Sequence, residues 1–193
     1  MKMFAAVSLL ALAASPAIAG EPDNLVLPRG FHASVVAEGV GQGRHLAIRG
    51  NDIYVSTNTA RDAEPVGIIA LRLDADHKVV ETQHFSTVAN GTSIRFYKNA
   101  LYATSPTTVY RFDFKGHELV PSSPAQVVID GLPSKGYPSR GMAFDGKGGL
   151  YIEAGATGNI CPDPAAPKGG KPVGLRPCPS LNGRSGVWRF DAS

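Results

Sequence analysis

Residues 139–155 constrain the fold most, because they read as two alternating strands around a glycine-rich turn and because weaker copies of the pattern precede them. The second strand of each copy opens on an aliphatic residue followed by tyrosine, at Ile53-Tyr54, Leu101-Tyr102 and Leu150-Tyr151. These pairs are 48 and then 49 residues apart. Similarity at a fixed period of this length indicates a series of equivalent supersecondary units.

Each copy continues with a third apolar segment that ends in aspartate, at residues 70–74, 109–113 and 187–191. After the first two, a turn leads to a fourth alternating segment, Val79–Phe85 and then Gln126–Ile129. Four short strands in each repeat are typical of β-propeller blades, which run about 40–50 residues. The sequence therefore predicts an all-β fold, a partial β-propeller of about three four-stranded blades.

The predicted propeller domain covers residues 20–193, with repeats near 44–90, 92–135 and 139–193. Ahead of the repeats, Phe31–Ala37 alternates and is predicted to be one N-terminal outer strand. It has no hairpin partner and needs to pair with a distant segment or another molecule. A β-sandwich is the alternative fold, because sandwiches also string short strands at even intervals. A sandwich gives no reason for the same order of elements three times.

The first nineteen residues have the three parts of a secretory signal peptide. Lys2 supplies a positive start, Phe4 to Ala14 form an apolar core, and Ala17-Ile18-Ala19 is a small-residue cleavage site before Gly20. The apolar core is shorter than the roughly 20 residues that a membrane span needs. We expect cleavage near Ala19-Gly20, no membrane span, and a periplasmic or secreted protein.

Charge and cysteine usage narrow the classes of function further. The formal net charge is +3, with basic and acidic residues interspersed, which argues against a nucleic-acid-binding face. The two cysteines, Cys161 and Cys178, lie in a proline-rich loop, residues 156–186. An exported chain meets an oxidising compartment, so we expect a disulfide between them. The loop either rims a binding site or is only a stapled loop, and the sequence leaves both open.

The candidate site residues lie where the innermost strands of a propeller begin, around a central channel. The aligned positions are Arg44-His45, Thr92-Ser93 and Arg140-Gly141. Two arginines and a histidine near one axis can hold an anionic cofactor or substrate, because guanidinium groups meet carboxylates bidentately. The alternative is that these side chains form ion pairs with acidic residues at strand ends. For Arg44 we favour the ion pair, and for Arg140 the sequence favours neither role. The other histidines are predicted to be solvated surface residues: His32, His77, His84 and His117.

Several segments resemble one family. Leu27-Pro-Arg-Gly-Phe31 and the run from Arg140 to Ile152 resemble soluble quinoprotein glucose and sorbosone dehydrogenases. The tail resembles the sorbosone-dehydrogenase-like branch, in Gly158-Asn-Ile-Cys161, in Arg176-Pro-Cys-Pro179 and in residues 185–192. The similarity covers essentially all of residues 25–193.

This resemblance implies a six-bladed propeller, pyrroloquinoline quinone (PQQ) as cofactor, calcium, and oxidation of sugars or related alcohols and aldehydes. It also implies that the sequence corresponds to about the N-terminal half of such an enzyme. The family places a histidine as general base a few residues ahead of the segment that begins at Arg140. Tyr137 stands at that position here, and a tyrosine with a pKa near 10 is a poor base at neutral pH.

Two functional hypotheses follow. In the first, the chain is a quinoprotein sugar dehydrogenase that is catalytically incomplete by itself, so whether it is an enzyme stays open. In the second, it is a non-catalytic periplasmic binding or assembly module. An open half-propeller exposes sheet faces and edges prone to pairing, so self-association or a complementing propeller half is the expected partner.

Overall fold

The computed structural model describes residues 25–57, 67–137, 140–158, 160–163, 165, 169 and 174–192. The predicted signal peptide, Pro138 with Ser139, and part of the cysteine loop lie outside the described residues. The chain divides into two compact units, residues 1–37 and residues 38–193.

The described part of the first unit, residues 25–37, contains no strand. Its chain turns at Arg29 and Gly30, where the Phe31 amide donates a hydrogen bond of 3.1 Å to the Pro28 carbonyl. The segment Phe31–Ala37 therefore differs from the predicted outer strand. An alternating sequence becomes a strand only when a partner supplies the other side of the hydrogen-bond ladder.

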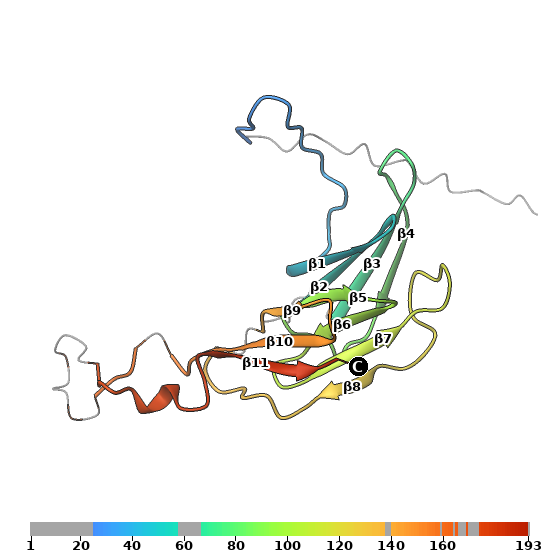
Figure 1. Ribbon diagram of the computed structural model, residues 1–193. Coiled ribbons are helices and arrows are strands. Elements are labelled where there is room, and N and C mark those ends of the chain that lie inside the picture. Colours follow the sequence, from blue (N-terminus) through green and yellow to red (C-terminus); the bar gives the residue numbers. More distant parts are fainter. Residues whose placement is uncertain are drawn as a thin grey trace, which may run out of the picture. The chain divides into compact units, whose positions relative to one another are not determined.

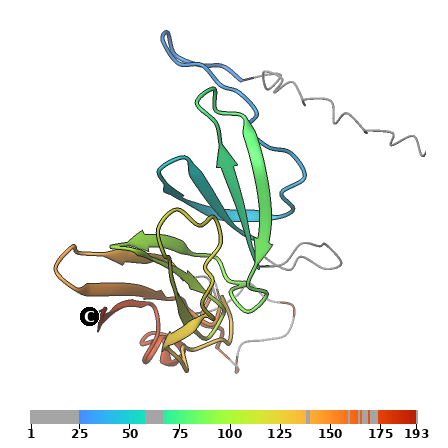
Figure 2. The same ribbon diagram turned by 90° about the vertical axis from the view of Figure 1, so that its right-hand side faces the viewer.

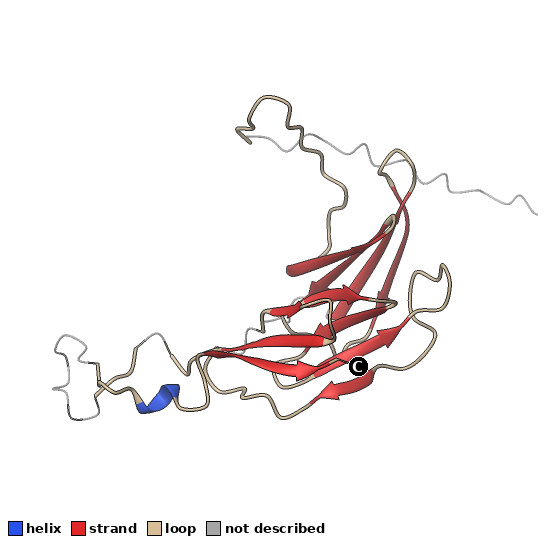
Figure 3. Ribbon diagram, viewed as in Figure 1, coloured by secondary structure: helices blue, strands red, loops and turns tan. Residues whose placement is uncertain are grey.

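The described strands of the second unit form three antiparallel sheets (Figures 1 and 3). The first sheet contains β1 (Gly43–Arg49), β2 (Asp52–Thr57), β3 (Gly67–Leu73) and β4 (Val79–Phe85). The second contains β5 (Ile94–Tyr97), β6 (Ala100–Thr104), β7 (Val109–Asp113) and β8 (Gln126–Ile129). The third contains β9 (Met142–Phe144), β10 (Gly149–Ala154) and β11 (Gly186–Asp191). Neighbours in each sheet are consecutive along the chain, which confirms the predicted partial propeller, with three described strands in the third sheet.

The hairpin turns explain why these residues pair consecutively. Gly50, Lys98 and Gly146 open the turns between the first and second strands of the three sheets, and all three have positive φ. Tight hairpins require this conformation, which glycine adopts without steric cost. In the third sheet the Asp145 carboxylate accepts hydrogen bonds from the amides of Lys147 and Gly149, and these bonds lower the pKa of Asp145.

The three sheets stack face to face in chain order, so the middle sheet is covered on both sides. All five residues of β6 are buried. Because side chains alternate across a strand, Leu101 and Ala103 join the core shared with the first sheet. Ala100 and Tyr102 join the core shared with the third sheet. Aromatic rings fill both cores: Tyr54 packs edge-on against Phe96 and Phe114 in one, and Tyr97 stacks on Phe144 in the other.

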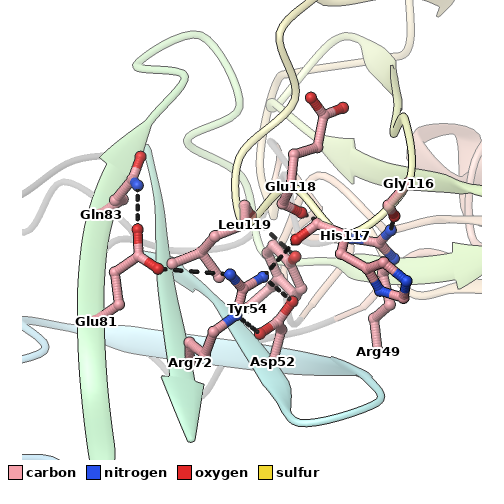
Figure 4. A network of polar contacts seen from close by, with 10 residues as sticks. All are labelled: Arg49, Asp52, Tyr54, Arg72, Glu81, Gln83, Gly116, His117, Glu118 and Leu119. Carbon is pink, nitrogen blue, oxygen red and sulfur yellow. Dashed lines mark hydrogen bonds and ion pairs between the residues drawn. The ribbon is translucent and has the colours of Figure 1, made fainter.

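A polar network fixes the first sheet to the loop between β7 and β8 (Figure 4). The buried Tyr54 hydroxyl donates to the Leu119 carbonyl at 2.9 Å, and burial raises the Tyr54 pKa. Arg72 forms a bidentate pair with Asp52 at 2.8 and 2.9 Å and also donates to the His117 carbonyl. Arg49 donates to the carbonyls of Gly116 and Glu118. The network lines a cavity of about 530 Å³, but its guanidinium groups are engaged by the protein.

We predict that Tyr54→Phe lowers the free energy of unfolding by about 1–3 kcal/mol, because the buried Leu119 carbonyl loses its hydroxyl donor. Urea denaturation followed by circular dichroism measures this. The exposed Tyr137 provides the matched control, and Tyr137→Phe is expected to change stability by less than about 0.5 kcal/mol. Equal effects of the two substitutions would show that the Tyr54 hydroxyl does not hold the sheets together.

Candidate functional site

The innermost strands β1, β5 and β9 run in the same direction, and their starts gather at one end of the stack. At the opposite end, the guanidinium carbon of Arg49, at the end of β1, lies 4.7 Å from the centre of the Phe114 ring. Phe114 in turn lies beside the β5–β6 turn, since its amide donates to the Asn99 carbonyl. Tyr97 at the end of β5 stacks on Phe144 at the end of β9. We call the other end, where the inner strands begin, the strand-start end. It lies on the left of the labelled strands in Figure 1 and faces away from the viewer in Figure 2.

Buried hydroxyl groups fill the strand-start end. They belong to Ser56, Thr57, Thr92, Ser93, Thr104, Ser105 and Thr108. Several of these side chains bond to the backbone where regular pairing stops: Ser56 Oγ lies within 3.4 Å of the His45 amide, and Thr104 Oγ1 accepts from the Ser93 amide at 3.1 Å. Thr108 Oγ1 instead donates to the Asp130 carboxylate at 2.9 Å. The hydroxyls therefore satisfy strand termini that would otherwise need water.

Arg140 joins this end to the neighbouring loops. Its amide donates to Thr92 Oγ1 at 2.9 Å, which brings together two positions that the aligned repeats predicted to be equivalent. Its side chain turns into the protein, is 1% exposed, and donates to the carbonyls of Pro106 and Pro133. Burial lowers the pKa of the guanidinium, and the charge of Arg184 lowers it further, whereas Glu153 raises it. The geometry makes Arg140 an anchor for two loops.

Arg44 and His45 have the opposite character. Both are exposed at the start of β1, beside the bulge where the β1–β2 register shifts between Gly43 and His45. The backbone of His45 is fixed by Ser56 on β2. Of the predicted cation trio, Arg44 and His45 are thus the side chains available to a ligand in solution.

Tyr137 lies in a tight crossing of two backbone segments. Its amide donates to the Ala156 carbonyl at 3.2 Å, and its side chain is 47% exposed. Gly136 has φ +87°, and a Cβ there would lie 2.4 Å from Thr157 Cα, so only glycine fits this position without strain. Arg184 donates to the Lys135 carbonyl at 2.6 Å and holds the same linker. Sequence reasoning missed Arg184, because an acceptor on the backbone leaves no pattern in side-chain types.

The loop between β10 and β11 contains the predicted disulfide. Cys161 and Cys178 are bonded, with Cα atoms 5.7 Å apart, which confirms the pairing. Ser180 Oγ lies 3.0 Å from the sulfur of Cys178, in a short 3₁₀ helix, η1 (Pro179–Leu181). Described residues of this loop, among them Thr157, Ile160 and Leu175, line an open pocket of about 540 Å³.

The remaining titratable groups do not form a metal centre within the described part of the chain. No group of three or more His, Cys, Asp or Glu side chains there is placed to hold a metal ion. His32, His77, His84 and His117 are all exposed, in agreement with the prediction that they are surface residues. Among the same residues, no helix has the length and apolar character to cross a membrane.

Comparison with protein families matches residues 25–173, more than half of the chain, to the family described as TrAA12-like. The chain belongs to the TrAA12-like family. This agrees with the predicted resemblance to PQQ-dependent sugar dehydrogenases. Comparison with curated protein sequences gives no match.

Solved structures show the same fold at low identity. The holo form of the pyranose dehydrogenase PQQ domain from Coprinopsis cinerea aligns with TM-score 0.62 and 16% identity, over 81% of this chain and 35% of that one. The calcium structure of Trichoderma reesei Carbohydrate-Active Enzymes Family AA12 aligns with TM-score 0.64 and 15% identity, over 86% of this chain and 39% of that one. The chain thus spans well under half the length of these structures.

We predict that Arg140→Met lowers the free energy of unfolding by about 3 kcal/mol, because two loop carbonyls lose a charged donor. The exposed Arg44 is the matched control, and Arg44→Met is expected to cost less than about 0.5 kcal/mol. Thermal and urea unfolding of the two variants measure the difference. Similar small effects would show that Arg140 does not anchor the loops.

We also predict that the purified protein takes up no thiol reagent until it is reduced, and two reagent molecules afterwards, as measured by intact mass. Reduction is expected to lower the free energy of unfolding by about 3 kcal/mol, since a cross-link across 17 residues of sequence restricts the unfolded chain. A Cys161→Ser/Cys178→Ser variant with unchanged stability would contradict this account.

Proposed function

We propose that this chain is part of a PQQ-dependent sugar oxidoreductase of the periplasm or the extracellular space, and that it does not complete the reaction by itself. The observation that carries the proposal is the family match over residues 25–173 on three stacked antiparallel sheets. By its resemblance to the sorbosone-type branch, the substrate is a sugar or a related alcohol or aldehyde. The predicted signal peptide and the disulfide support export.

The described residues fit the cofactor only in part. A quinone that carries carboxylates needs accessible cations, and Arg44 with His45 supplies two exposed basic side chains at the strand-start end. Arg140 is engaged by the carbonyls of Pro106 and Pro133 instead. The described residues also provide no cluster of metal ligands for calcium. These residues therefore do not by themselves fit the quinone and its metal, and we derive no reaction step through them.

The base position leads to the same proposal. Tyr137 is 47% exposed and its backbone amide is held by the Ala156 carbonyl. A general base needs a pKa near the working pH. The aligned solved structures are longer, since this chain covers 35–39% of their length. We propose that the missing basic contacts and metal ligands come from further blades.

A non-catalytic exported binding or assembly module is the second candidate. It is favoured by the combination of tyrosine at the base position and an inward-facing Arg140. In this case the three blades act as a scaffold. The exposed Arg44 and His45 at the strand-start end bind a ligand, and no reaction is catalysed.

Reconstitution tests the proposal. We expect purified residues 20–193, incubated with PQQ and calcium, to give no dye-linked oxidation of glucose or sorbosone, while a complete quinoprotein glucose dehydrogenase assayed in parallel does. Cooperative unfolding of the same sample verifies that it is folded. Tyr137→His is expected to stay inactive as well, because a base alone does not supply the metal ligands. Turnover by the wild-type chain would refute incompleteness, and turnover by Tyr137→His alone would show that the base is the only missing group.

A further inference from the structure

The loop that contains the disulfide, between β10 and β11, also holds the chain that leaves β8. We call residues 130–137 the β8–β9 linker. Near the start of the disulfide loop, the Ala156 carbonyl accepts a hydrogen bond of 3.2 Å from the Tyr137 amide. Near the end of the loop, Nη1 of Arg184 donates to the Lys135 carbonyl at 2.6 Å. The disulfide loop therefore holds the linker at two positions, one of which is Tyr137.

The contact at Tyr137 is a close approach of two backbones. A Cβ on Gly136 would lie 2.6 Å from the Ala156 carbonyl oxygen. In the facing segment, a Cβ on Gly155 would lie 2.7 Å from the Tyr137 carbonyl oxygen. A Cβ atom does not fit at either distance, so glycine is needed on both sides of the crossing. Because the backbones touch, a shift of the first residues of the loop displaces Tyr137.

The contact at Lys135 continues through backbone hydrogen bonds to the disulfide. The Leu181 amide donates to the Cys178 carbonyl at 3.2 Å, and the Arg184 amide donates to the Leu181 carbonyl at 2.9 Å. The helix η1 lies within this stretch. The disulfide ties Cys178 to Cys161. It thus joins the part of the loop that carries Arg184 to the part that begins at the crossing with Tyr137.

Arg184 also lies close to a buried cation of the candidate site. Arg140 donates to the Pro133 carbonyl of the same linker. Burial lowers the pKa of the Arg140 guanidinium, and the charge of Arg184 lowers it further, as a like charge within electrostatic range does. Arg184 therefore belongs to the strand-start end, although it is distant in sequence from the other candidate residues.

We propose that Arg184 is a positioning residue for Tyr137, and that the Cys161–Cys178 disulfide holds Arg184 in place for this role. The disulfide loop then fixes the β8–β9 linker from both sides and is part of the candidate site. Only the meaning of position 137, as the place of a general base, rests on the proposed function. The positioning itself rests on contacts within the second unit.

The test is amide hydrogen exchange of purified residues 20–193, followed by nuclear magnetic resonance. Arg184→Ala is expected to speed exchange of the Tyr137 amide on the order of tenfold, because the linker loses its charged donor at Lys135. The amide of Ser93, which is buried at the same end, is expected to exchange at its wild-type rate. Arg184→Lys keeps a charged donor and is expected to restore part of the protection.

The matched control is Arg44→Ala, which removes the same charge from an exposed residue at the strand-start end. It is expected to leave exchange at Tyr137 unchanged, and cooperative unfolding verifies that each variant is folded. Reduction of the disulfide is expected to speed the Tyr137 amide in the wild type. It should add little in Arg184→Ala, because both changes act through one contact.

Unchanged exchange at Tyr137 in Arg184→Ala would overturn the proposal. Equal acceleration at Tyr137 and Ser93 would also overturn it, because that result indicates a general loss of stability. If reduction adds its full effect in Arg184→Ala, the disulfide does not act through Arg184. Exchange needs no turnover, so failure of this proposal stays distinct from failure of the proposed function, which reconstitution tests.

Discussion

Packing on both faces of the second sheet positions the first and third sheets. β6 contributes buried side chains in both directions, towards Tyr54 of the first sheet and towards Phe144 of the third. Edge-to-face aromatic contacts, which contribute about 0.5–1.5 kcal/mol beyond their area, occur in both cores. Since the inner strands are fixed at the aromatic end, their starts are brought together at the other end. The geometry of the candidate site is therefore a consequence of sheet packing.

At the strand-start end, most of the buried polar side chains stabilise the fold. Arg140 and the buried hydroxyls hold strand termini and loops. Arg44 and His45 remain accessible, and Tyr137 is exposed in a crossing that Gly136 makes feasible. The chain covers 35–39% of the length of the aligned solved structures.

The strands were predictable from sequence because local signals agree with tertiary packing. β4, β7 and β8 begin and end at the residues that alternation indicates. In each sheet, a turn that contains a residue with positive φ joins the first strand to the second. Phe31–Ala37 shows the limit, since alternation specifies which residues share a face but not whether a partner strand is present.

Side-chain direction at the site was less predictable for a related reason. The repeat placed Arg140 at the start of an inner strand, and its amide does bond to Thr92 there. Its guanidinium group donates hydrogen bonds to the backbone carbonyls of Pro106 and Pro133. Such acceptors have no signature in the sequence. The same holds for Arg49 with Gly116 and for Arg184 with Lys135. The disulfide, in contrast, depended only on two cysteines and an oxidising compartment, and it was predicted correctly.

The central claim is that three repeats form three sheets stacked through the second one. Nuclear Overhauser spectroscopy of residues 20–193 tests it most directly. The account predicts cross-peaks from the Tyr54 ring to the Phe96 ring and from the Tyr97 ring to the Phe144 ring, which join different sheets, and from the Tyr54 ring to the Phe114 ring, which joins the first sheet to the β7–β8 loop. Spectra in which Tyr54 and Tyr97 contact only residues of their own sheets would contradict it.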